Sequence, residues 1–368
     1  MYYSVVFLGI LAILFCILHL RDHPHRPITR PNVVQPRDDR PSDERAPIGQ
    51  FPTNEALATR NTTSQSSNDQ PTPAQSSKKI PLSVNYHLTR QCNYKCGFCF
   101  HTATNSHIEP IENAQKAMSL LKDAGMRKIN FAGGEPVLKA KFLGQLAKYC
   151  KETLQLESVS IVTNGSKVTD RWLSEYGKYI DIMAVSCDSF DEETNVKIGR
   201  GTGKHLETFK QLAQRCEMHK VMFKVNTVVN IYNYEEDMNT AIKEVNPKRW
   251  KCFQVLVVPE ENGSDKTLRD ARKFQITDEQ FKLFCDKHEH HKCFVPEGND
   301  VMASSYLLLD EYLCFLNKGV KEKTKSILEI GVEEALKDVY WDEEGFTERG
   351  GVYDWSEPSK SAQRKLDW

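Results

Sequence analysis

The sequence predicts an α/β fold in which parallel strands alternate with crossover helices. After residue 80, six short runs rich in β-branched and aromatic residues are separated by segments in which apolar residues recur at helical spacing. This alternation is typical of a parallel sheet, open or curled into a partial barrel, that binds ligands at the carboxyl ends of its strands. The chain has 368 residues, a net charge of −1 and a mean hydropathy of −0.54. These values exclude a polytopic membrane protein and a globally basic field that would attract a nucleic-acid polymer.

Residues 1–20 form an apolar segment with no charged side chain. As a helix, such a segment reaches roughly 30 Å, the thickness of the hydrocarbon core of a bilayer. No basic residue precedes it and no small-residue cleavage site follows, which favours an uncleaved membrane anchor over a signal peptide. Five arginines between residues 21 and 40 favour a cytosolic position for the rest of the chain.

Residues 21–80 are predicted to form a disordered linker. They hold nine of the sixteen prolines and the polar run NTTSQSSNDQPTPAQSS. So few apolar side chains cannot offset the entropy of ordering the backbone.

The remaining chain divides into a predicted barrel domain, residues 81–299, and a C-terminal extension, residues 300–368. The expected strands are Leu82–Leu88, Lys128–Ala132, Ser158–Thr163, Ile182–Cys187, Val221–Val229 and Trp250–Val257. The expected helices between them are Asn113–Ala124, Ala140–Thr153, Asp170–Tyr179, His205–His219 and Tyr234–Val245.

Three cysteines follow the first predicted strand at C-x3-C-x2-C spacing: Cys92, Cys96 and Cys99. Three thiolates suit a [4Fe–4S] cluster that leaves one iron open for a ligand. The alternative is a partial zinc site, but structural zinc sites use four ligands, usually as two C-x2-C pairs. The nearest later pair, Cys285 and Cys293, is too widely spaced for that role.

The spacing C-x3-C-x-aromatic-C resembles the signature of the radical S-adenosylmethionine (SAM) superfamily, and Gly133-Gly134-Glu135 at the end of the second strand resembles its GGE motif. The resemblance is closest to the viperin-like family of antiviral radical SAM enzymes and covers residues 81–368. It rests on the segments CNYKCGFCFHTA, KINFAGGEPVL, VTNGSKV, SCDSFDEETN and the terminal LDW. The resemblance implies a partial (β/α)6 barrel with a C-terminal extension, a [4Fe–4S] cluster bound by the three cysteines, and SAM.

The resemblance also implies a SAM site around the GGE motif, in which the glutamate carboxylate meets the SAM ammonium. Phe98 is expected beside the adenine, and Arg200 is expected at the SAM carboxylate. The full set of SAM-binding residues implied is Phe98, Gly133, Gly134, Glu135, Asn164, Ser186 and Arg200. Ala132 departs from the serine common at this position in the family, which leaves the local contacts open.

Enzymes of this family convert CTP to 3′-deoxy-3′,4′-didehydro-CTP, a chain terminator for viral polymerases. In that reaction a 5′-deoxyadenosyl radical abstracts the ribose 4′-hydrogen, and an electron donor is required. The resemblance leaves two alternatives open: the same chemistry on UTP or another nucleotide, and a membrane-tethered scaffold that needs no turnover.

Side-chain alternation gives an independent indication of the ligand. Lys224 and Asn226 lie on one face of the fifth strand, and Arg249 and Lys251 lie on one face of the sixth. Strands buried beneath helices are expected to be apolar on both faces, so a polar face indicates a lumen built for a triphosphate. The alternative is that lysines at strand starts, such as Lys128, extend to water. The resemblance assigns nucleotide binding to Asn85, Lys128, Lys224, Asn226, Arg249, Lys251 and Tyr306.

Tyr306 is the candidate catalytic proton or hydrogen donor near the sugar. A structural role is the alternative, because SSYLLLDEYLCFL has the spacing of an amphipathic helix. Farther along, Gly350-Gly351 beside Tyr353 is expected to form a loop that closes over the nucleotide.

The terminal Leu366-Asp367-Trp368 resembles the signal that the cytosolic iron–sulfur targeting machinery reads. Together with residues 1–20, the resemblance implies a location on the cytosolic face of the endoplasmic reticulum and on lipid droplets. Whether the anchor spans the membrane or lies on it stays open.

Two further groups of metal-binding residue types carry simpler interpretations. His288, His290 and His291 are expected at a solvated helix end rather than at a metal. Buried thiols are expected at Cys150, Cys187, Cys216, Cys252, Cys285, Cys293 and Cys314.

Overall fold

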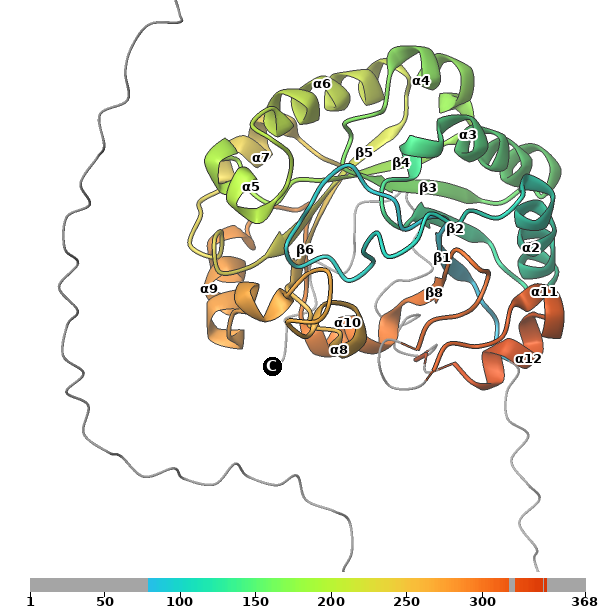
Figure 1. Cartoon of the computed structure of the whole chain (residues 1–368). Helices are drawn as coiled ribbons and strands as arrows, with labels where there is room; N and C mark the ends of the chain where they lie inside the picture. Colours follow the sequence, from blue (N-terminus) through green and yellow to red (C-terminus); the bar gives the residue numbers. More distant parts are fainter. Residues whose placement is uncertain (1–78, 318–321, 340, 343–368) are drawn as a thin grey trace, which may run out of the picture. The chain divides into compact units, whose positions relative to one another are not determined.

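The computed structural model describes residues 79–317, 322–339 and 341–342 (Figure 1). The predicted anchor, nearly all of the linker, the Gly350-Gly351 loop and the terminal Trp368 lie outside these residues. Within them, no helix is both long and apolar enough to cross a membrane.

A single parallel sheet organises the described part of the chain, with strand order β7-β6-β5-β4-β3-β2-β1-β8. Its strands are β1 (Ser83–His87), β2 (Lys128–Ala132), β3 (Ser158–Thr163), β4 (Ile182–Ser186), β5 (Met222–Val229), β6 (Arg249–Gln254), β7 (Phe294–Glu297) and β8 (Leu307–Leu309). The six predicted strands are all present, and the bounds of β2 and β3 are those predicted. The two edge strands, β7 and β8, were not predicted.

The helices cover the outer side of the curved sheet, so the predicted partial barrel is confirmed (Figure 1). The α-helices are α2 (Ile111–Asp123), α3 (Ala140–Lys148), α4 (Asp170–Tyr176), α5 (Glu192–Ile198), α6 (His205–Met218), α7 (Asn239–Val245), α8 (Pro259–Asn262), α9 (Asp278–His288), α10 (Asn299–Ser305), α11 (Ile327–Ile330) and α12 (Val332–Lys337). Single turns of other helix types are η1 (Pro136–Lys139), η2 (Tyr149–Thr153), η3 (Gly177–Tyr179) and η4 (Ala271–Phe274).

The outer face of the sheet packs against these helices and forms the main core. Tyr86, Phe131, Ile161 and Val225 alternate with the polar residues of their strands and are fully buried. Trp250 on β6 packs edge-on against Phe284 of α9, with ring centroids 6.0 Å apart. Burial of this face leaves the opposite face of each strand to line the inside of the half-barrel.

The prediction of a helix through Tyr306 is wrong. Helix α10 ends at Ser305, Tyr306 is extended with φ −110° and ψ 127°, and Leu307–Leu309 pairs with β1 as strand β8. All three leucines are buried. A strand covered on both faces buries consecutive apolar residues, whereas a surface helix exposes part of such a run.

The predicted start of the helix before β6 is also wrong. Helix α7 begins at Asn239 rather than at Tyr234. The preceding residues form a turn in which the Asn233 side chain accepts a hydrogen bond from the Asn230 backbone and the Tyr234 N–H donates to the Asn230 carbonyl. Asparagine side chains that bond nearby backbone compete with helix formation.

The prediction of a solvated histidine cluster is wrong for His288. Its side chain is fully buried against Phe284 and Trp250. Its Nε2 accepts a hydrogen bond from the Met238 N–H, and burial lowers its pKa to about 4. His290 is exposed, as predicted.

The prediction of buried thiols is confirmed for six of the seven cysteines: Cys150, Cys187, Cys216, Cys252, Cys285 and Cys314. It is wrong for Cys293, which is a free thiol but only half-buried.

Candidate active site

The three cysteines of the C-x3-C-x2-C segment lie on the loop that follows β1, at the carboxyl edge of the sheet. Helix α5 holds this loop, because the Lys95 N–H donates to the Gly199 carbonyl at 3.0 Å and the Gly97 N–H donates to the Ile198 carbonyl at 2.9 Å. Gly199 has φ +87°, and a Cβ there would stand 2.3 Å from the Lys95 carbonyl oxygen. The sharp end of α5 therefore allows the loop backbone to lie directly against it.

The donor set, three free thiols on one short loop, fits an iron–sulfur cluster. Burial raises the pKa of the Cys96 thiol to about 12 and raises that of Cys92 as well, so a bound metal must stabilise the thiolates. Each thiolate of a three-cysteine set binds a different iron of a [4Fe–4S] cluster, whereas a structural zinc site needs a fourth ligand.

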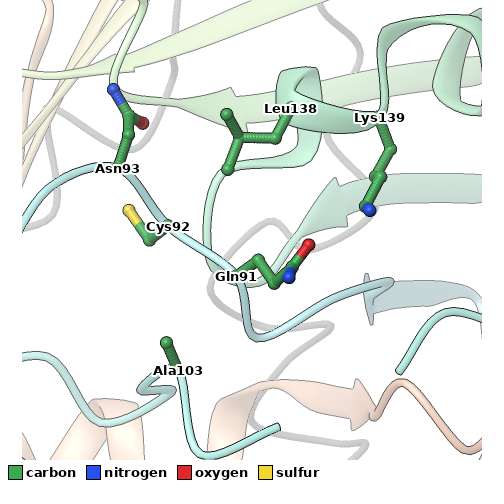
Figure 2. Close-up of a pocket in the computed structure, with 6 residues that line it drawn as sticks. All are labelled: Gln91, Cys92, Asn93, Ala103, Leu138 and Lys139. Carbon is green, nitrogen blue, oxygen red and sulfur yellow. The ribbon is translucent and has the colours of Figure 1, made fainter. Parts of the chain in front are cut away.

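A hollow of about 480 Å³ opens beside this loop. Gln91, Cys92 and Asn93 line one side, and Leu138 and Lys139 of η1 line the other (Figure 2). The hollow therefore adjoins both the first cysteine and the turn that follows the GGE motif.

The two glycines of the GGE motif allow β2 to pack against the base of the cysteine loop. Gly133 has φ +114°, and a Cβ on Gly134 would stand 2.1 Å from the Gln91 carbonyl oxygen. The Gly134 and Glu135 N–H groups donate to the carbonyls of Thr89 and Gln91, both at 2.7 Å. The missing side chains of these glycines therefore allow the backbone of β2 to lie directly against the cysteine loop.

Glu135 is fully buried and joins β2 to the end of β3. One carboxylate oxygen accepts from the Thr163 hydroxyl at 2.7 Å and from the Val137 N–H, and the other accepts from the Asn164 N–H at 2.7 Å. Burial raises the pKa of Glu135 despite these three hydrogen bonds. The carboxylate is thus fixed in orientation and retains acceptor capacity for a ligand ammonium.

Asn164 connects the end of β3 to the cysteine loop. Its amide nitrogen donates to the Asn93 side chain at 3.0 Å and lies 3.9 Å from the Cys92 sulfur. Ser186 ends β4 on the same edge, where its carbonyl contacts the His205 ring at 2.9 Å. These two predicted residues are brought to the rim that carries the cysteines.

Arg200 is buried and paired with Asp188, a residue that the sequence analysis missed. The Arg200 Nη2 lies 2.7 Å from Asp188 Oδ2, and the guanidinium carbon lies 5.9 Å from the centre of the Phe98 ring. Burial opposes the charge, but the Asp188 carboxylate raises the pKa of Arg200 above its ordinary value. Arg200 and Phe98, both predicted for the SAM site, therefore lie side by side.

The inner face of β1, β2 and β3 carries a chain of polar side chains. The Asn130 amide donates to the Asn85 side chain at 2.6 Å, and the Ser160 hydroxyl donates to the Asn130 oxygen at 2.8 Å. Lys128, the first residue of β2, lies two residues before Asn130 on the same face of the strand. It pairs in register with Ser83 of β1 and Ser158 of β3. The predicted polar lining is thus present on this half of the sheet.

Three of the four predicted cationic residues gather on the other half of the inner face. Lys224 pairs in register with Arg249, and Asn226 pairs with Lys251, one step nearer the carboxyl edge. Burial, with Lys251 and Arg249 nearby, holds the pKa of Lys224 well below its ordinary value. The four residues predicted to bind a nucleotide here are therefore close together.

Lys251 and Tyr306 share a partner, Glu297, that the sequence analysis missed. The Lys251 ammonium donates to the Tyr306 hydroxyl at 2.6 Å and to Glu297, and the Tyr306 hydroxyl also donates to Glu297. The only sequence signal was an acidic residue closing the short run FVPE, which is too brief to predict a strand.

A second missed group lies between the cysteine loop and the segments that follow β6 and β8. Arg90 donates two hydrogen bonds to Glu261 and one to Glu311, at 2.8–2.9 Å. Beside Glu311, the buried rings of His87 and His101 are 4.5 Å apart, and burial lowers the pKa of both. Partners 171 and 221 residues away in sequence left no local pattern to detect.

Comparisons with known proteins indicate the class of protein to which this fold and site belong. The Radical SAM superfamily profile matches residues 86–245. The crystal structure of Streptococcus suis SuiB bound to S-adenosylmethionine is similar with a TM-score of 0.56 and 18% identity, over 74% of this chain and 68% of that chain. The chain is therefore a radical SAM protein in fold, and its cofactors are a [4Fe–4S] cluster and SAM.

Relatives in sequence narrow the class further. The S-adenosylmethionine-dependent nucleotide dehydratase RSAD2 of Danio rerio is 53% identical over 78% of this chain and 81% of its own length. An S-adenosylmethionine-dependent nucleotide dehydratase of Lacinutrix mariniflava is 41% identical over 78% of this chain and 61% of its own length. The chain belongs to the family of S-adenosylmethionine-dependent nucleotide dehydratases.

Proposed function

We propose that this chain dehydrates CTP to 3′-deoxy-3′,4′-didehydro-CTP. The observation that carries the proposal is the cationic inner face formed by Lys224, Arg249 and Lys251, below a cysteine loop suited to a [4Fe–4S] cluster. Family membership supplies the reaction class. In this class, SAM bound at a reduced cluster supplies the 5′-deoxyadenosyl radical that takes the ribose 4′-hydrogen.

We assign the cofactor site to residues of the carboxyl edge. Cys92, Cys96 and Cys99 would hold the cluster. Glu135, already fixed by three hydrogen bonds, would accept from the SAM ammonium, and Arg200 would face the SAM carboxylate. The walls of the SAM site would be completed by Phe98, Gly133, Gly134, Asn164 and Ser186.

We assign nucleotide binding to the inner face. Its phosphates would be held by side-chain cations, which is consistent with the absence of a G-x4-GK[ST] loop from the sequence. The binding residues proposed are Asn85, Lys128, Lys224, Asn226, Arg249, Lys251 and Tyr306. The protein's own contribution is to orient the sugar and to exclude water from a radical. Tyr306, hydrogen-bonded to Lys251, is the proposed proton or hydrogen donor.

The test uses the full chain, reconstituted anaerobically with iron and sulfide. It is incubated with SAM, dithionite and each of the four nucleoside triphosphates in turn. We expect CTP to stimulate 5′-deoxyadenosine formation and to yield a nucleotide lighter by one water. The same result with UTP alone would keep the chemistry and change the substrate. SAM cleavage that no nucleotide stimulates, from a fully loaded cluster, would contradict the proposal and favour a non-catalytic scaffold.

We propose that residues 1–20 attach the enzyme to the cytosolic face of the endoplasmic reticulum and to lipid droplets, on the strength of their uncharged composition. Deleting them is expected to release the protein from the membrane fraction of expressing cells. Trp368 is proposed to recruit the cytosolic iron–sulfur machinery. Its deletion is expected to lower the iron content of protein isolated from cells, but not of protein reconstituted in vitro.

A further inference from the structure

Glu297 is a carboxylate in a place that a triphosphate site would be expected to avoid. It ends β7 in register with Phe253, which puts it on the inner face of the sheet, and its side chain is buried. Among the strand residues that the structure describes, it is the one carboxylate on that face. A buried negative charge beside phosphate-binding cations repels phosphate. Its presence therefore constrains where in the lumen a phosphate is able to bind.

Glu297 holds two of the proposed nucleotide-binding residues in one hydrogen-bonded array. One of its oxygens accepts from the Lys251 ammonium and the other accepts from the Tyr306 hydroxyl, while Lys251 also donates to Tyr306. The Lys251 nitrogen lies 5.2 Å from the centre of the Tyr306 ring. The array thus presents a carboxylate, a phenol and an ammonium together, which is a combination suited to sugar hydroxyls. A carboxylate is the group that reads ribose hydroxyls in dinucleotide-binding folds.

The charges are ordered along the strands. Lys224 and Arg249 form the deepest pair, Asn226 and Lys251 form the next, and Glu297 pairs with Phe253 one step nearer the carboxyl edge. Each step of two residues advances about 6.6 Å along a parallel strand. The backbone of the Lys224–Arg249 pair therefore lies about 13 Å below the level of Glu297, and Glu297 lies toward the edge that carries the cysteine loop.

We propose that Glu297 sets the direction in which the nucleotide enters the lumen. Its charge directs the triphosphate to Lys224 and Arg249, and its array with Lys251 and Tyr306 receives the ribose. The sugar then lies toward the carboxyl edge, where the radical is formed. This inference rests on the proposed function and adds to it a positioning residue. If Glu297 positions the ribose in this way, most SAM cleavage events lead to product. A ribose misplaced by about 1 Å would react on the order of 100-fold more slowly.

The test compares Glu297→Gln with the unaltered chain and with Glu289→Gln, which makes the same chemical change at an exposed position. Two quantities are measured on reconstituted full-length protein at fixed ionic strength. The first is the Kd of inorganic tripolyphosphate, which has no sugar. The second is the ratio of dehydrated nucleotide to 5′-deoxyadenosine.

For Glu297→Gln we expect tripolyphosphate to bind more tightly, by about tenfold, because a like charge is removed. We expect the product ratio to fall at least about fivefold, because the sugar is no longer held. Glu289→Gln is expected to change neither quantity. An unchanged Kd or an unchanged product ratio for Glu297→Gln would overturn the inference. A purely structural role would lower activity without tightening the binding of tripolyphosphate.

The experiment separates this inference from the proposed function. If the unaltered chain dehydrates no nucleotide, the proposed function fails, and with it the ribose-orienting role of Glu297, whatever the tripolyphosphate measurement gives. If Glu297→Gln lacks a cooperative thermal transition, Glu297→Asp takes its place, because it keeps the charge and shortens the side chain. We expect that variant to bind tripolyphosphate like the unaltered chain and to show a lowered product ratio. Tighter tripolyphosphate binding or an unchanged ratio in Glu297→Asp would overturn the inference.

Discussion

The carboxyl edge of the sheet and the lumen beneath it treat buried charge in opposite ways. At the edge, the two charged residues proposed for the SAM site have partners within the protein: Arg200 pairs with Asp188, and the Glu135 carboxylate accepts three hydrogen bonds. In the lumen, Lys224 is close to Arg249 and Lys251 and has a strongly lowered pKa. At the edge Arg200 has an opposite charge beside it, whereas in the lumen the buried Lys224 ammonium lies near two like charges, which favours binding of an anion.

Both regions are proposed to bind a ligand, but they differ in how far their charged side chains also stabilise the fold. A balanced buried pair is strongly destabilising to break, whereas an unbalanced buried cation is itself destabilising. Substitutions at the two ends are therefore expected to change stability in opposite directions, which is the trade-off commonly seen at functional sites.

The largest effect is expected from breaking the buried ion pair at the edge. Asp188→Ala leaves the Arg200 guanidinium without its carboxylate and removes the acceptor of the Val228 N–H. We expect the free energy of unfolding to fall by about 3–5 kcal/mol, measured by urea titration. The control is Asp286→Ala, which breaks the exposed pair with Lys282 and is expected to cost below about 1 kcal/mol. Equal losses in the two variants would show that the edge is not held by its internal charge pairs.

The next effect concerns the contact between the GGE motif and the cysteine loop. Gly134→Ala would push a methyl group against the Gln91 carbonyl, so either β2 or the loop must move. We expect a loss of about 3 kcal/mol in unfolding free energy. The iron bound per chain after reconstitution is expected to fall as well, because the loop that carries Cys92 is displaced.

Gly177→Ala is the matched control for that substitution. A Cβ at Gly177 meets no heavy atom closer than 3.8 Å, so stability and iron content are expected to stay close to those of the unaltered chain. Full iron binding by Gly134→Ala would contradict the view that this glycine exists for the close approach of the loop.

A change of opposite sign is expected in the lumen. Lys224→Met removes a cation that is held with a lowered pKa beside two others. We expect the free energy of unfolding at neutral pH to rise by about 2 kcal/mol, while the Kd for nucleoside triphosphate weakens. Lys210→Met, at an exposed helix position, is expected to change neither. A destabilised Lys224→Met would show that the lumen is balanced after all.

The strands that position the site were predictable because each has one face buried under helices. β2 and β3 alternate in burial over most of their length, from Lys128 to Phe131 and from Val159 to Thr163. β7 and β8 escaped prediction because each is very short, and Leu307–Leu309 has apolar residues at consecutive positions, which fits a helix equally well. The spacing of apolar residues alone does not show whether such a short run forms a strand or a helix.

The residues of the candidate site also divide into those that were predicted from the sequence and those that were missed. Cys92, Glu135 and Lys224 were found because spacing, motif and strand alternation are local properties of the sequence. Asp188 and Glu297 were missed because their roles come from partners on other elements. Asp188 directly follows the predicted fourth strand, and this position is the sequence signal that points to a role at the carboxyl edge.

The smallest expected effect is a dependence of stability on pH that originates at the edge. His205 is fully buried beneath Ser186, and burial, with Arg200 nearby, lowers its pKa to about 3. Between that value and the unfolded value of about 6.5, the unfolded chain binds a proton that the folded chain excludes. Stability is therefore lost as the pH falls through this window. We expect His205 to account for about 1–2 kcal/mol of the loss between pH 7 and pH 5.

Urea titrations of the unaltered chain and of His205→Phe at the two pH values measure this contribution as a difference. The loss on acidification is expected to be smaller in His205→Phe by that amount, whatever the substitution does to stability at pH 7. His290→Phe, at an exposed site, is expected to keep the full loss. An equal loss in His205→Phe and in the unaltered chain would mean that His205 accepts its proton in the folded state. In that case a second positive charge would be tolerated at the edge, next to Arg200. The electrostatic contrast between the edge and the lumen would then be weaker than proposed.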